Sequence, residues 1–183
     1  MPNCGISAGI GIICNDLRRT GGLAKNAWIG SITDLRASFN VDSTTDINTI
    51  ELNTYRTLYR FEGAKFAHSA TSNMVKTDSG NVSWTHEVTL KVYNTTTADD
   101  QVLQDLAVSD VFVIVQTLND DFLIYGAGNG LSASAMPMQT GKAAGDDSGT
   151  SIVLTGSERT VPKRFSVNGD KTLTLARLNA QSA

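Results

Sequence analysis

Residue types that commonly perform catalysis are sparse in this sequence. The motif GISAG, residues 5–9, has the spacing of a nucleophile elbow with Ser7 at its centre. Such an elbow requires a core strand before the nucleophile and a helix after it, and only four residues precede this motif. His68 and His86 lie eighteen residues apart, with no Cys or Glu partner at metal-ligand spacing. We therefore expect no catalytic or metal-binding role for these three residues.

Two glycine-rich motifs could form phosphate-binding loops. In GAGNGL, residues 126–131, Leu131 stands where a dinucleotide fingerprint has its third glycine, and no helix pattern follows. In TGKAAG, residues 140–145, Met136 occupies the place of the first Walker A glycine, and Ala143 replaces the magnesium-binding hydroxyl residue. Glycine adopts positive φ without steric cost, so we predict turns here and no nucleotide cofactor. The glycines expected to serve such turns are Gly130, Gly141, Gly145 and Gly149.

Acidic residues and cysteines do not indicate a metal or disulfide site either. Asp146 and Asp147 are adjacent, without the alternating oxygen ligands of a calcium loop. The two cysteines, Cys4 and Cys14, are too few for a disulfide framework or a four-ligand zinc site. We expect free thiols, no metal, no cofactor and no enzyme activity.

The composition indicates one folded domain. The chain has 183 residues, 40% of them hydrophobic and 18% charged, with a formal net charge of −3. This charge gives no basic surface for general binding to duplex DNA. No apolar run approaches the roughly eighteen residues of a membrane span, so we expect no membrane association.

Most of the chain has the pattern of short β-strands. The clearest strand is SWTHEVTLKVYN, residues 83–94, in which His86 shares the apolar face with Val88 and Leu90. TDSG at residues 77–80 is a turn signal before that strand. Residues 111–125 read as a hairpin with its polar tip at Asn119, Asp120 and Asp121. The sequences TSIVLTG (150–156) and KTLTLARL (171–178) are predicted to supply two more strands.

One helix is predicted, at about residues 98–107. Thr97 is the expected N-cap, Asp99 and Asp100 lie in the first turn, and Leu103 and Leu106 have helical spacing. The predicted fold is therefore mainly β: an antiparallel β-sandwich or barrel with one short helix and extended arms. We expect a single domain over residues 1–183, with a glycine-rich N-terminal arm at 1–27.

A predicted strand containing HEVTLKV is followed by a helix, an apolar strand with an Asn-Asp turn, YGAGNGLSAS, TGKAAGDDSG and TSIVLTGSE. This order of motifs resembles that of the tail tube (major tail) proteins of tailed bacteriophages, in particular small versions from phages of Bacteroidetes-type bacteria. The resemblance spans roughly residues 1–165. Thr150-Ser151 departs from it, because the family often has an aromatic residue there, and residues 165–183 have no counterpart. The matching positions are Tyr125-Gly126, Gly130-Leu131, Gly141, Gly145-Asp146, Gly149, Leu154-Thr155-Gly156, Glu158 and Pro162.

The resemblance implies a virion structural protein, made in the bacterial cytoplasm, that self-assembles into stacked hexameric rings around a lumen. Its partners would be further copies of itself and other tail proteins such as the tape measure, the terminator and the baseplate. DNA would be non-specific cargo in the lumen, and 15 Lys and Arg residues in 183 suit a wall that does not grip it.

Two alternatives stay open. A related ring, connector, terminator or decoration protein of a phage or contractile injection device would share the fold without forming a long tube. An enzyme or ligand-binding module on a β-sandwich would need a convergent set of titratable groups in a pocket.

Overall fold

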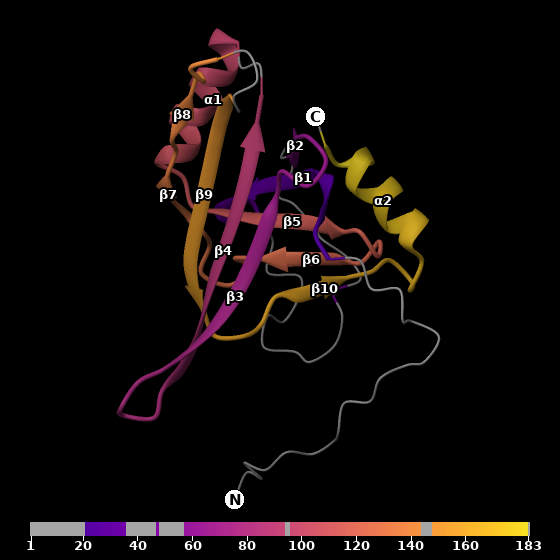
Figure 1. Ribbon diagram of the computed structural model, residues 1–183. Helices are drawn as coiled ribbons and strands as arrows, with labels where there is room; N and C mark the ends of the chain where they lie inside the picture. Colours follow the sequence, from indigo (N-terminus) through magenta and orange to yellow (C-terminus); the bar gives the residue numbers. More distant parts are fainter. Residues whose placement is uncertain (1–20, 36–46, 48–56, 94–95, 144–147, 183) are drawn as a thin grey trace, which may run out of the picture.

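The computed structural model describes residues 21–35, 47, 57–93, 96–143 and 148–182. They form two five-stranded antiparallel sheets that pack face to face (Figure 1). The predicted sandwich is confirmed, and the alternative of a closed barrel is not found. The first sheet has the order β10 (Lys163–Phe165), β6 (Phe122–Tyr125), β5 (Val111–Thr117), β1 (Leu23–Ser31) and β2 (Tyr59–Glu62). The second has the order β3 (Ser69–Lys76), β4 (Val82–Val92), β9 (Gly149–Glu158) and β7 (Ser132–Ala135), and β8 (Met138–Gln139) also pairs with β9.

The main core lies between the two sheets. β4 and β9 pair in a register that sets Val88 opposite Leu154 and Leu90 opposite Ile152, and all four side chains are fully buried. The helix α1 (Thr97–Ala107) adds Leu103 and Leu106 to this core. The first sheet contributes the buried residues Ala27, Ile29, Val113, Val115 and Tyr125.

The first sheet is buried on its other face as well. Trp28, Phe112 and Ile114 are fully buried there, in a second cluster that includes Leu178 of the helix α2 (Lys171–Ala180). Figure 1 shows α2 beside this sheet, on the side away from the second sheet. β5 therefore begins with a continuous apolar run, Val111–Val115, because both of its faces must be apolar.

Within the described residues, the second sheet is covered on one face only. Its outward-facing residues are mostly hydroxyl-bearing and are intermediate in exposure or exposed. We call this surface the outer face; its residues on β3, β4 and β9 are Ser69, Thr71, Asn73, Thr85, Glu87, Thr89, Lys91, Ser151, Val153, Thr155 and Ser157.

Several predicted elements are confirmed. His86 lies on the buried face of β4 with Val88 and Leu90. The hairpin of β5 and β6 turns through Asn119–Asp121, and β3 joins β4 through the predicted turn, in which the Thr77 backbone N–H donates to the Asn81 carbonyl over 2.9 Å.

Three predictions are wrong. Residues 171–178 form the helix α2 and not a strand, because the Asp170 carboxylate caps the backbone N–H groups of Thr172 and Leu173. The N-cap of α1 is Thr96 and not Thr97, and Thr96 forms a capping box with Asp99. The expected arm at 1–27 overlaps β1, which begins at Leu23 because that side chain enters the core; residues 1–20 lie outside the described residues.

Candidate functional site

The glycine loop after β6 binds a carboxylate of the protein itself. Glu158, at the end of β9, is only 4% exposed. Its Oε1 accepts hydrogen bonds from the backbone N–H groups of Gly128 at 3.1 Å and Asn129 at 2.9 Å. The Asn129 side-chain amide donates in return to the Ser157 carbonyl over 2.7 Å. Consecutive backbone N–H groups of this kind are a common way to bind an anion, and here Glu158 supplies it.

The predicted turn glycines have the expected backbone. Gly130, Gly141 and Gly149 have φ values of 87°, 72° and 128°, which confirms the turn interpretation; Gly145 lies outside the described residues. At Gly149 a Cβ would also come within 2.5 Å of the Val92 carbonyl oxygen. Close backbone approach and positive φ therefore both require glycine at this position.

A buried cluster of titratable side chains lies next to this loop. The rings of His86 and Tyr125 meet edge to face with 5.3 Å between their centroids. The Nε2 of His86 lies 3.1 Å from the Thr160 carbonyl oxygen, whereas its buried Nδ1 has no hydrogen-bond partner among the described residues. Burial lowers the pKa of His86, although Glu158 and the Thr160 carbonyl act in the opposite direction. His86 is thus held neutral in the core.

His68 joins the two sheets. Its Nδ1 accepts a hydrogen bond from the Lys91 backbone N–H on β4 at 3.2 Å, so the proton of the neutral ring is on Nε2. Nε2 lies 2.9 Å from the Lys25 carbonyl oxygen on β1, to which it donates. Burial lowers the pKa of His68 more than the bond to Lys25 raises it. Among the described residues, neither histidine belongs to a cluster of metal ligands, and both side chains are buried.

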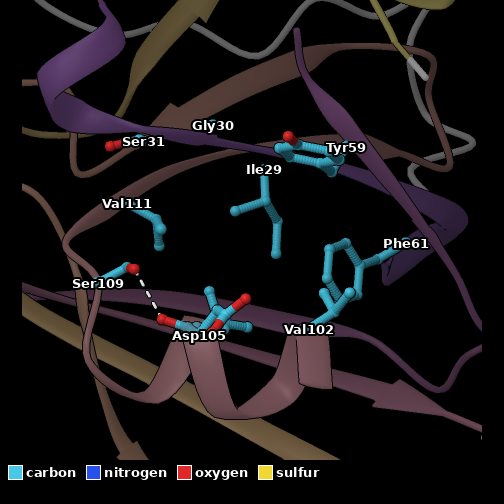
Figure 2. A pocket seen from close by; sticks show the side chains of 10 residues that line it. Ile29, Gly30, Ser31, Tyr59, Phe61, Val102, Asp105, Ser109 and Val111 are labelled. Atoms are coloured by element: carbon cyan, nitrogen blue, oxygen red, sulfur yellow. Dashed lines mark hydrogen bonds between the residues drawn. The ribbon is translucent and has the colours of Figure 1, made fainter. Parts of the chain in front are cut away.

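A shallow apolar pocket lies between the edge of the first sheet and α1 (Figure 2). Its volume is about 250 Å³, and Ile29, Phe61 and Val102 point into it. Four residues with polar side chains also line it: Ser31, Tyr59, Asp105 and Ser109, whose hydroxyl donates to the Asp105 carbonyl at 2.7 Å. Ligand pockets are typically about 300–1,000 Å³, so this pocket is slightly smaller than that range.

The β3–β4 hairpin extends beyond the rest of the sandwich (Figure 1). Met74, Val75 and Val82 near its end are 57%, 44% and 48% exposed. β3 is also the terminal strand of its sheet, so its outer edge has no strand partner within the described residues. Open strand edges and exposed apolar side chains both favour pairing with another chain.

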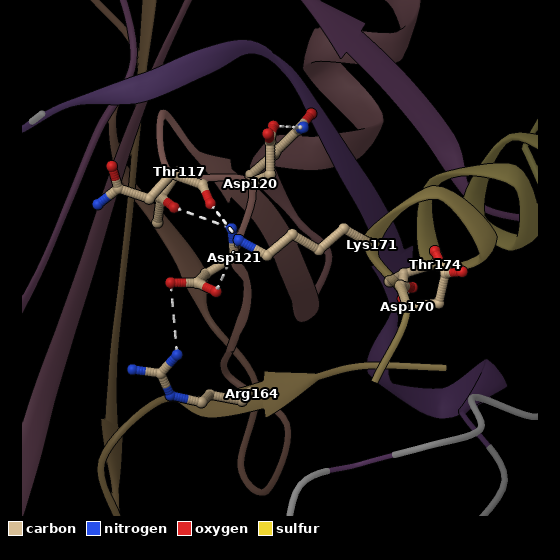
Figure 3. A network of polar contacts seen from close by, with 9 residues as sticks. Thr117, Asp120, Asp121, Arg164, Asp170, Lys171 and Thr174 are labelled. Carbon is tan, nitrogen blue, oxygen red and sulfur yellow. Dashed lines mark hydrogen bonds and ion pairs between the residues drawn. The ribbon is translucent and has the colours of Figure 1, made fainter. Parts of the chain in front are cut away.

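A surface network fixes α2 and β10 to the β5–β6 turn (Figure 3). The Asp121 carboxylate lies 3.4 Å from Arg164 and 3.7 Å from Lys171. Lys171 also donates to the Asn119 carbonyl over 2.5 Å. These groups are well exposed and each pair is worth little, so the network positions α2 and is not a binding site.

The remaining sequence candidates do not form a site in the part of the chain that the structure describes. Ser7, Cys4, Cys14, Asp146 and Asp147 lie outside the described residues. Among those that are described, no three His, Cys, Asp or Glu side chains cluster as metal ligands. No described helix is both long enough and apolar enough to cross a membrane.

Glu158 is a buried residue whose partners the sequence does not reveal. The sequence identifies it only as one position of the motif order described above, since no spacing rule connects it to a loop thirty residues earlier. A comparison of the chain with protein-family models, with curated proteins and with solved structures finds no match in any of the three.

Proposed function

We propose that this chain is a virion structural protein that self-assembles into the stacked rings of a phage tail tube through which DNA passes. The resemblance implies that each ring is a hexamer. The observation that carries the proposal is the order of motifs from HEVTLKV to TGSE, which resembles the tail tube family. In this proposal the protein is part of the tail of the virion, and its partners are its own copies and the other tail proteins.

The fold supports the proposal in two ways. A β-sandwich with a projecting hairpin offers an open strand edge and exposed apolar side chains, which a neighbouring copy would cover. The two edges of the second sheet are different surfaces, because one edge is formed by β3 and the other by β7 and β8. Pairing them between copies is a head-to-tail contact, which generates a ring when the rotation closes.

A connector or terminator ring of the same fold is the second candidate. It is favoured by α2, because this helix lies in the segment that has no counterpart in the resemblance and packs Leu178 into the second cluster on the first sheet. Such a protein would form single closed rings without stacking.

Light scattering of the full-length protein at micromolar concentration tests self-association. We expect a mass many times that of the 19.5 kDa chain. Both candidates would be contradicted if the protein stayed monomeric at every salt concentration and no assembly partner made it associate.

A further inference from the structure

We infer that the outer face of the second sheet lines the lumen, and that its hydroxyl residues form the surface along which duplex DNA moves. This inference rests on the proposed function, and it specifies which strands of the subunit face the DNA. Three observations carry it: the burial of the first sheet, the chemistry of the outer face and its charge.

The first sheet has no free face within the described residues. One face packs on the second sheet, and the other is covered by the cluster around Trp28, Phe112 and Leu178. A sheet with both faces buried cannot be the wall of a channel. The second sheet is the one with a face open to solvent.

The residues on that face are short and polar over three neighbouring strands. Across β3 and β4, Thr71 pairs with Glu87 and Asn73 with Thr85. Across β4 and β9, Thr85 pairs with Ser157 and Glu87 with Thr155. Side chains that pair directly across strands lie side by side on one face, so their hydroxyl groups form a continuous hydrated surface.

The charge of the outer face is balanced. Glu87 and Lys91 are its only ionisable side chains among the residues that define it, and they sit four residues apart on β4, with Thr89 between them on the same face. Duplex DNA carries about one negative charge per 1.7 Å of axis, and its non-specific affinity comes from Lys and Arg that neutralise phosphates. A face without net positive charge leaves the DNA free to slide. The opposite side of the molecule, by contrast, carries Lys171 and Arg177 on the exposed side of α2.

Cysteine accessibility in assembled tubes tests the inference. The test uses a chain in which both native cysteines are removed by Cys4→Ser and Cys14→Ser. Into this chain we would introduce Thr85→Cys on the outer face or, as the control on α2, Ala176→Cys. Both positions accept a small side chain, and Ala176 is exposed. Tubes would be treated with N-ethylmaleimide and, separately, with a maleimide-linked polyethylene glycol too bulky to enter the lumen.

We expect Thr85→Cys in tubes to react with the small reagent only, and Ala176→Cys to react with both. Reaction of Thr85→Cys with both reagents would place this face outside, and reaction with neither would place it in a subunit contact; each overturns the inference. Thr155→Cys gives the same readout if Thr85→Cys does not assemble. If the wild-type chain forms no tubes at all, the proposed function itself fails, which is a separate result.

Discussion

The carboxylate of Glu158 lies 2.9 Å from the backbone nitrogen of Asn129, and the same oxygen lies 3.1 Å from that of Gly128. A loop that resembles a phosphate cradle in sequence is thus filled by the chain's own anion. This contact attaches the end of β9 in the second sheet to the loop that follows β6 in the first sheet. The glycines of this loop serve folding, since the space they create is occupied.

Replacing Glu158 by alanine should destabilise the protein. Two backbone N–H groups would lose their acceptor in a nearly buried site, at a cost of about 1–3 kcal/mol. Thermal unfolding monitored by circular dichroism measures the change. Glu87→Gln is the matched control, because Glu87 is exposed on the same sheet and should unfold as the wild type does. If Glu158→Ala melted at the same temperature as Glu87→Gln and the wild type, the stabilising role of the Glu158 carboxylate would be contradicted.

Gly149→Val should destabilise the fold by about 1–3 kcal/mol, because the backbone there is left-handed. The new Cβ would also meet the Val92 carbonyl oxygen. Gly21 is the control, since no atom lies within 4 Å of a Cβ built there and its φ is not left-handed. We expect Gly21→Val to melt close to the wild type. Added nucleotides should not shift the melting temperature of the wild type or of either variant. If the loop bound phosphate, nucleotides would raise the melting temperature of the wild type.

Stability should fall as the pH is lowered below about 6.5, the ordinary pKa of histidine. Burial lowers the pKa of both His68 and His86 in the folded protein. The unfolded chain therefore takes up protons at a pH where the folded protein does not, and this favours unfolding as the pH falls through the lowered values. Melting temperatures between pH 8 and pH 5 measure the effect.

His86→Phe separates one histidine from the other. Phenylalanine keeps the ring contact with Tyr125 but removes both ring nitrogens: Nδ1, which has no partner within the described residues, and Nε2, which lies 3.1 Å from the Thr160 carbonyl oxygen. We expect the variant to fold and to lose part of the acid sensitivity, while His68 retains the rest. An unchanged pH profile would show that His86 does not contribute.

Much of the fold was predictable from local patterns. A strand with one buried face alternates apolar and polar residues, whereas a strand buried on both faces is a continuous apolar run. α2 was missed for a physical reason. KTLTLARL alternates apolar and polar residues at its start, which indicates a strand, but Thr174 and Leu178 are the buried pair at helical spacing. The N-cap Asp170 was the available signal.

The site was less predictable than the fold. Hydrogen bonds such as those from Gly128 and Asn129 to Glu158 join residues that are distant in sequence, and only the packed sheets bring them together. The same holds for His68, which links Lys25 and Lys91. Sequence alone identified each residue type but not its partner.

The end of the β3–β4 hairpin should be needed for assembly and not for folding. Met74→Asp adds a charge to a side chain that is already 57% exposed, so the melting temperature of the subunit should change little. If a neighbouring copy covers this position, the charge is buried on assembly and association is lost. Leu173→Asp on α2, where the side chain is 49% exposed, is the control. Normal assembly of Met74→Asp would exclude the hairpin end from the contact.

Electron microscopy of the purified full-length protein, in negative stain at micromolar concentration, tests the central claim most directly. The proposal predicts long hollow tubes made of stacked rings, with a lumen wide enough for duplex DNA. Single closed rings would favour the connector or terminator alternative. Only monomers, at every salt concentration and with no larger species, would contradict a tail tube function.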